Sequence, residues 1–224
     1  MSMTTKAAAA LAAAAFALAG CSGETSPESA VTASVATVDG PAISRSVLAA
    51  VESADTGAAT LSASGLTQAL DLDLTPDGLN ALMATPDGSG GQVLLVGAEA
   101  WTRPAEGDPW TPASTGADDE GGAALLQVVS STAALANPRL YAEALANGLV
   151  TITSSDEAAT TYAIVPSAGW TPSGLPGAGA PAAVSVTVGA DGRPSAGTIR
   201  ATGGGEIGVT FSRWGEPEEL KAPS

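Results

Sequence analysis

The sequence predicts an α+β fold in which one large antiparallel sheet carries its helices on one face. Apolar residues recur with a period of two in two separate groups of short segments. A helical period appears before the first group and again between the two groups. The 27 glycines and 15 prolines cluster between these segments, which is typical of many short elements joined by turns.

The N-terminus has the form of a secretory signal. Lys6 is followed by an apolar run from Ala7 to Leu18, too short to cross a hydrocarbon core of about 30 Å as a helix. The small residues at the end of this run precede the only cysteine of the chain, a pattern that resembles the lipobox of bacterial lipoproteins: Leu18, Ala19, Gly20, Cys21. The alternatives are a generic signal peptide with a leftover cysteine and a buried apolar helix.

This resemblance predicts three regions. Residues 1–20 would be removed as a lipoprotein signal peptide, and residues 21–38 would form the lipidated Cys21 and a flexible, Ser/Thr/Ala-rich stalk. Residues 39–224 would form the folded domain. Because two or more acyl chains hold a protein firmly on a bilayer, we expect export and anchoring to the outer face of the cell membrane through Cys21.

Composition excludes several functional classes. The segment after residue 20 contains 7 basic and 23 acidic residues, a formal charge of −16, and such a surface repels nucleic acid. There is no histidine, and Cys21 is the only thiol, which removes Ser-His-Asp and Cys-His catalysis and the usual zinc ligand sets. We therefore expect no enzyme activity, catalytic residue, metal site, cofactor or nucleic-acid partner.

The first half of the domain begins with a helix and continues as a strand meander. Asp39 and Pro41 suit a helix start, and the apolar residues that follow form one stripe: Ile43, Val47, Leu48, Val51. Between residues 58 and 111 we expect four strands, at about 70–74, 79–83, 92–103 and 110–111. The alternation from Leu70 to Leu74 places Asp71 and Asp73 on the outward face, where solvated charge explains them more simply than a Ca²⁺ site.

The second half of the domain is predicted as two helices and about five strands. The helices cover residues 121–136 and 138–146, with Asn137 and Pro138 at their junction. The strands lie near 149–153, 160–165, 184–188, 198–202 and 207–211. The segment 190–193 reads as a hairpin turn, and so do the glycines at 203–205.

Three local features resemble the LppX/LprAFG family of actinobacterial lipoproteins, relatives of the LolA/LolB-type carriers. The segment 96–103 followed by 107–111 is similar to that family's aromatic strand, Gly-rich turn and Trp-Thr pair. Residues 190–193 resemble its penultimate hairpin turn. Residues 211–217, followed by Ala222 and Pro223, resemble its terminal strand and Ala-Pro ending.

The resemblance implies a half-barrel, in which a curved antiparallel sheet wraps the helices around an apolar cavity. It also implies a carrier that binds the acyl chains of a lipid or lipoglycan cargo in that cavity and carries them across the envelope. The apolar faces that would line the cavity are Leu70, Leu72, Leu74, Leu125, Val128, Val129, Val184, Val186, Val188, Ile207, Val209 and Phe211. Ordinary core packing is the simpler explanation for any one of these residues.

A second hypothesis is a tethered, non-enzymatic envelope scaffold without lipid cargo, for which an envelope transporter is the candidate partner. Exposed apolar patches on the outside of the sheet would favour the scaffold, and an internal apolar space would favour the carrier.

Overall fold

The computed structural model describes residues 37–76, 78–85, 90–113, 120–172, 181–203, 205–217 and 219–223. The lipobox residues 18–21 and the stalk segment 22–36 lie outside the described residues, as does Gly204 of the predicted turn at 203–205. The described elements, in chain order, are α1 (Gly40–Glu52), β1 (Thr56–Ala63), β2 (Leu66–Asp73), β3 (Asn80–Ala84), β4 (Gln92–Val96), β5 (Glu99–Arg103), β6 (Thr111–Pro112), α2 (Glu120–Ala136), α3 (Pro138–Ala146), β7 (Gly148–Ser155), β8 (Ala159–Pro166), β9 (Ala183–Gly189), β10 (Pro194–Arg200) and β11 (Glu206–Ser212).

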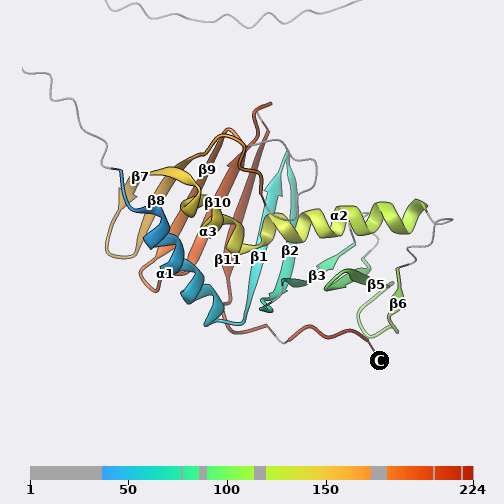
Figure 1. Ribbon diagram of the computed structural model, residues 1–224. Helices are drawn as coiled ribbons and strands as arrows, with labels where there is room; N and C mark the ends of the chain where they lie inside the picture. Colours follow the sequence, from blue (N-terminus) through green and yellow to red (C-terminus); the bar gives the residue numbers. More distant parts are fainter. Residues whose placement is uncertain are drawn as a thin grey trace, which may run out of the picture. The chain divides into compact units, whose positions relative to one another are not determined.

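All eleven strands belong to one sheet, in the order β6-β5-β4-β3-β2-β1-β11-β10-β9-β8-β7. Every neighbouring pair is antiparallel. The two edge strands, β6 and β7, do not pair with each other, so the sheet is open. It curves around the helices, and α2 crosses β1 and β2 and extends over β3 to β5 (Figure 1). The predicted α+β class and the half-barrel are therefore confirmed.

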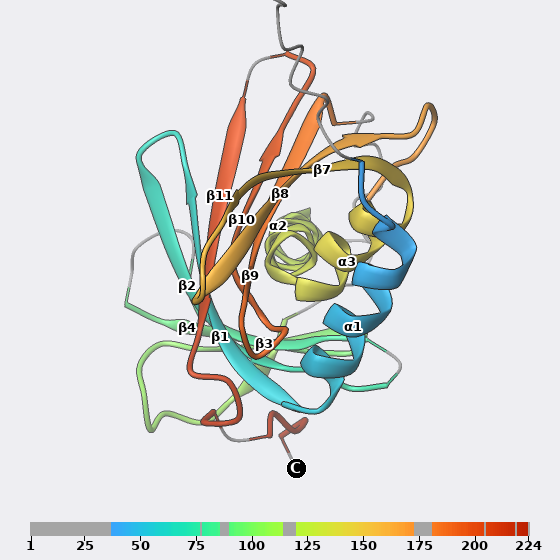
Figure 2. The same cartoon turned by 90° about the vertical axis from the view of Figure 1, so that its left-hand side faces the viewer.

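The first and third helices begin where side-chain caps predict. The Asp39 side chain accepts a hydrogen bond from the Ala42 N–H at 3.0 Å, and the Asn137 side chain accepts one from the Arg139 N–H at 3.0 Å. Each cap satisfies a donor that the helix itself leaves unpaired. Helices α1 and α3 pack against each other on the concave side of the sheet (Figure 2).

The first half of the sheet has six strands, so the predicted count of four is wrong. The segment 56–63 is a strand of its own, although its alanines blur the period of two. The predicted strand 92–103 is a hairpin, because Gly97 adopts φ +60° and reverses the chain between β4 and β5. An isolated glycine inside an apolar run was the one signal of this turn.

The core lies between the concave face and the helices. Alternate residues of the strands point into this core. Among them are Leu72, Val93 and Val186, whose exposed fraction is 0 %. Helix α2 contributes only a narrow buried stripe of Val129, Ala133 and Ala136. None of the helices in the described ranges is long and apolar enough to span a membrane.

A buried polar clamp holds the C-terminal tail against the sheet. Asn80, which is 7 % exposed, donates to the Asp73 carboxylate at 3.1 Å and to the Leu220 carbonyl at 3.3 Å. The Asn80 carbonyl oxygen accepts from the Gly97 N–H at 3.0 Å, and Asp73 accepts from the Leu220 N–H at 3.1 Å. Asp73 therefore accepts hydrogen bonds that hold the tail in place, and it is not the solvated charge expected from the sequence.

Replacing Asn80 with alanine is expected to lower the free energy of unfolding by about 1–3 kcal/mol, because it leaves buried partners unsatisfied. Amide exchange at Leu220 should accelerate as the tail detaches. The matched control is Thr153→Ala, which removes one exposed hydroxyl that donates to the Thr161 carbonyl at 3.2 Å and should stay within about 0.5 kcal/mol of the parent. Equal effects of the two changes in urea unfolding would contradict the clamp.

Candidate functional site: an apolar groove beneath α2

A groove lies between α2 and the strands β1, β2, β3 and β11, on the concave side of the sheet. Its volume is about 270 Å³, close to the lower end of the roughly 300–1,000 Å³ of small-molecule sites. The residues that line it are mostly apolar: Leu61, Ala63, Leu66, Thr67, Gln68, Met83, Val128, Thr132, Leu135 and Ile207. We call this space the α2 groove.

Strand register explains how the floor of the α2 groove forms. Ala63 pairs with Leu66 across the β1–β2 turn and with Ile207 of β11. Leu61, two residues earlier on the same face, pairs with Gln68. Because alternate residues of a strand face the same side, these side chains form one surface below α2.

The polar side chains of the α2 groove are largely satisfied by the protein. The Thr132 hydroxyl donates to the Val128 carbonyl at 2.8 Å, and the Gln68 amide donates to the Ala84 carbonyl at 3.2 Å. Few hydrogen-bonding groups of the groove are therefore free to bind a polar ligand. The groove is better suited to a hydrocarbon chain.

The rim of the α2 groove exposes two large apolar side chains. Leu66, at the start of β2, is 77 % exposed, and Val128 of α2 is 48 % exposed. Large apolar residues grouped around a concavity mark binding sites. The apolar surface of the groove therefore continues at its rim into surface that is exposed to solvent.

The predicted cavity-lining residues fall into two groups. Val128 and Ile207 line the α2 groove. The other ten pack in the core between the sheet and the helices, where Leu125 is partly buried and the rest are buried: Leu70, Leu72, Leu74, Leu125, Val129, Val184, Val186, Val188, Val209 and Phe211. Sequence reasoning did not place Leu61, Leu66 or Met83 at a binding site, and the alternation of Leu61, Ala63 and Leu66 around Ser64-Gly65 was the available signal.

The centre of the concave face is packed around Tyr141 of α3. Its ring is fully buried, lies against Gly197 of β10 and meets Phe211 edge-on, with centroids 5.7 Å apart. The Tyr141 hydroxyl is the only buried side-chain polar atom in the described residues that lacks a hydrogen-bond partner. Burial raises the pKa of Tyr141, so the hydroxyl stays protonated.

Two other hollows are less suited to hydrocarbon. One, of about 490 Å³, lies between α2, α3 and β4 and includes Ser130, Asn137, Arg139 and Glu143 in its lining. The Arg139 guanidinium there donates to the Gly78 carbonyl at 2.7 Å. This hollow is larger than the α2 groove, but two charged side chains in its wall would have to lose water to admit an acyl chain.

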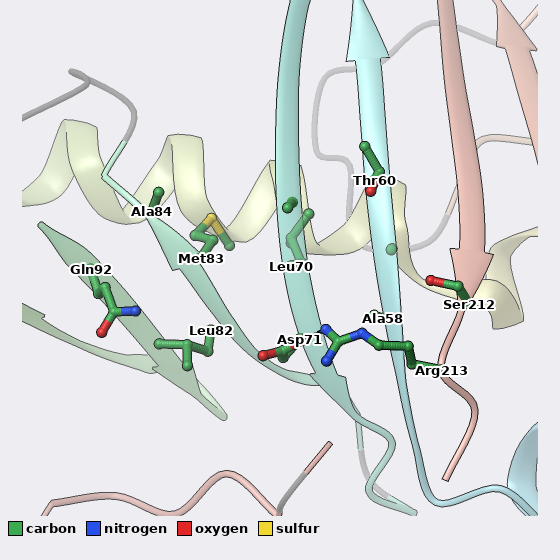
Figure 3. A pocket seen from close by; sticks show the side chains of 12 residues that line it. Ala58, Thr60, Leu70, Asp71, Leu82, Met83, Ala84, Gln92, Ser212 and Arg213 are labelled. Carbon is green, nitrogen blue, oxygen red and sulfur yellow. Dashed lines mark hydrogen bonds and ion pairs between the residues drawn. The ribbon is translucent and has the colours of Figure 1, made fainter. Parts of the chain in front are cut away.

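The other hollow, of about 300 Å³, lies on the convex face. Figure 3 shows Arg213 reaching across β1 toward Asp71 of β2, with which it forms an ion pair. Asp71 is therefore paired rather than simply solvated. No group of three or more metal-ligating side chains occurs in the part of the chain that the structure describes.

The comparison with protein-family models finds no match, and neither does the comparison with curated proteins. Among solved structures the chain is similar to the Mycobacterium tuberculosis lipoprotein LppX, with 16 % identity and a TM-score of 0.48 over 81 % of this chain and 98 % of that one. A DUF1329 family protein from Desulfovibrio piger matches with 10 % identity and a TM-score of 0.34 over 78 % of this chain and 92 % of that one.

A chain of the Pseudomonas aeruginosa MucA/MucB complex matches with 14 % identity and a TM-score of 0.39, over 77 % of this chain and 56 % of that one. Each of these TM-scores is below 0.5, so the fold and the function are argued from the residues of this chain.

Proposed function

We propose that this chain is a cell-envelope lipoprotein that binds the acyl chain of a lipid or lipoglycan in the α2 groove and carries it across the envelope. The observation that carries the proposal is an apolar groove whose rim exposes Leu66 and Val128. The lipobox-like residues 18–21 support anchoring of Cys21 to the outer face of the membrane. The binding itself requires no covalent chemistry.

Hydrophobic transfer supplies the free energy of binding. Each methylene group that leaves water contributes about 0.8 kcal/mol, so about six methylene groups in the groove would contribute about 5 kcal/mol. A space of about 270 Å³ admits part of one chain rather than a whole lipid. The remainder of the ligand would extend past the rim at Leu66 and Val128.

Native mass spectrometry of the protein expressed in a bacterial envelope, followed by organic extraction, tests the proposal. We expect one co-purified lipid per protein, and after its removal we expect added phospholipid or glycolipid to bind again with the same stoichiometry. Protein that is repeatedly lipid-free and takes up neither class of lipid would overturn the carrier function.

A tethered scaffold without lipid cargo is the second candidate. The packed centre of the concave face favours it, because Val186 and Tyr141 are fully buried among protein groups. The exposed pair Leu149 and Val165 on the outside of the sheet favours it as well. A lipid-free protein that co-purifies with an envelope transporter after cross-linking in cells would support this candidate.

A further inference from the structure

The strands from β2 through β1 to β7 have two distinct ends. At the first end, which we call the upper end, lie the β1–β2 turn (63–66), the end of β10 (Arg200), the start of β11 (Glu206), the end of β8 (Pro166) and the start of β7 (Gly148). The opposite end carries the β7–β8 and β9–β10 turns and the start of β1. In Figure 2 the β1–β2 turn and the upper ends of β10 and β11 lie toward the top of the view.

Exposed apolar side chains lie at two places along the upper end, on β2 and on the β7–β8 pair. Leu66 is 77 % exposed beside the β1–β2 turn. Leu149 and Val165 are 58 % and 60 % exposed, and they pair with each other next to Gly148 and Pro166. Both point away from the core, since Val150 and Ile164 beside them are buried. The α2 groove also reaches this end, through Ala63, Leu66 and Ile207.

Acidic side chains of the same strands and their connections outnumber the basic ones paired with them at the opposite end. They are Asp55, Asp71, Asp73, Asp156, Glu157 and Asp191, of which Asp71 pairs with Arg213 and Asp191 with Arg193. At the upper end, Glu206 of β11 is paired with Arg200 at 2.9 Å, and Asp39 caps α1. Anionic lipid headgroups repel acidic residues within a Debye length of about 8–10 Å. An acidic protein can therefore approach a bilayer closely with its upper end and not with the other.

The described chain also begins near the upper end. Thr37 pairs with Thr151 of β7, the Val38 N–H donates to the Val150 carbonyl at 3.2 Å, and α1 then starts beside Val150. Thr37 follows Cys21 by 16 positions, a length of chain that can span at most about 55 Å. That span permits close approach of the upper end to the bilayer in which Cys21 would be anchored.

We propose that the upper end docks on the lipid bilayer, with Leu66, Leu149 and Val165 entering its interfacial region. An acyl chain then passes between the bilayer and the α2 groove without crossing water. This inference rests on the proposed lipid binding, and it adds the membrane surface as a partner and a definite face of the fold as the contact.

Hydrogen–deuterium exchange tests the docking. The lipidated protein is reconstituted into vesicles of phosphatidylethanolamine and phosphatidylglycerol and compared with the Cys21→Ser chain in solution. We expect slower exchange on vesicles at 63–67 and at 165–170, and unchanged exchange at the opposite-end turns 155–159 and 189–194. Protection at the opposite end, or at neither end, would overturn the proposal.

Paired variants separate docking from lipid binding. Leu149→Glu with Val165→Glu changes exposed residues outside the α2 groove, so binding of a short-chain lysophospholipid in solution should be unchanged. Transfer of a fluorescent phospholipid from vesicles should slow at least about fivefold. The control Ser155→Glu alters an exposed residue at the other end of β7 and should leave the transfer rate unchanged.

The outcomes distinguish the two proposals. If the parent protein binds no lysophospholipid in solution, the lipid-binding function fails, whatever the exchange data show. If it binds, and the Leu149→Glu, Val165→Glu variant transfers lipid as fast as the parent, the docking inference is wrong while the binding function stands. Protection at the upper end with slowed transfer supports both.

Discussion

Replacing Gly197 with alanine is expected to destabilise the domain by about 1–3 kcal/mol. A Cβ at this position would lie 2.7 Å from Cδ1 and Cζ of Tyr141, well inside van der Waals contact. The ring cannot retreat easily, because Tyr141 is fully buried and packs edge-on against Phe211. Urea unfolding followed by circular dichroism measures the loss.

The matched control is Gly208→Ala on the neighbouring strand β11. The nearest atom to a Cβ there is the Ser62 carbonyl oxygen at 3.9 Å, so we expect a change within about 0.5 kcal/mol. Combining Gly197→Ala with Tyr141→Leu should cost less than the sum of the two single changes, since they share one contact. Strict additivity would show that the Tyr141 ring does not lie on Gly197.

Replacing Val128 with tryptophan is expected to weaken acyl-chain binding at least about tenfold, equivalent to about 1.4 kcal/mol. Val128 lines the α2 groove and is 48 % exposed, so α2 can accept the larger side chain while the indole occupies the groove. Titration of the delipidated protein with a fluorescent fatty acyl lipid measures the dissociation constant.

Gln127→Trp is the control for this change. Gln127 is an exposed residue of the same helix and does not line the groove, so we expect parental affinity. Val186→Trp is unsuitable as a variant that fills the lipid site. Val186 is fully buried, so the larger side chain would overpack the core and destabilise the fold. Equal affinity of Val128→Trp and Gln127→Trp would place the ligand elsewhere.

Local signals predicted much of the fold from the sequence. Asp39 and Asn137 cap helices as their residue types indicate, and residues 190–193 form the turn between β9 and β10. The alternation of Leu70 and Leu72 identified the buried face of β2. These features depend on neighbours in the sequence, which a pattern can reveal.

The α2 groove could not be predicted in the same way. Its floor depends on the register that places Ala63 between Leu66 and Ile207, residues far apart in the chain. Val128 and Val129 are adjacent in the sequence, but 129 is fully buried and 128 is half exposed, because α2 meets the sheet along a narrow stripe. Sequence patterns indicate which face of a helix or strand is apolar. Only the packing of the helix on the sheet determines where a space remains between two such faces.

Photo-crosslinking is the most direct test of acyl-chain binding in the α2 groove. The protein would be loaded with a phospholipid that carries a diazirine near the end of one acyl chain, irradiated, digested and sequenced by mass spectrometry. We predict crosslinks to residues 61–68 of β1 and β2 and to residues 128–135 of α2, and their loss in Val128→Trp. Crosslinks confined to the convex hollow around Asp71 and Arg213, or to the hollow around Arg139, would contradict the assignment of the α2 groove as the lipid site.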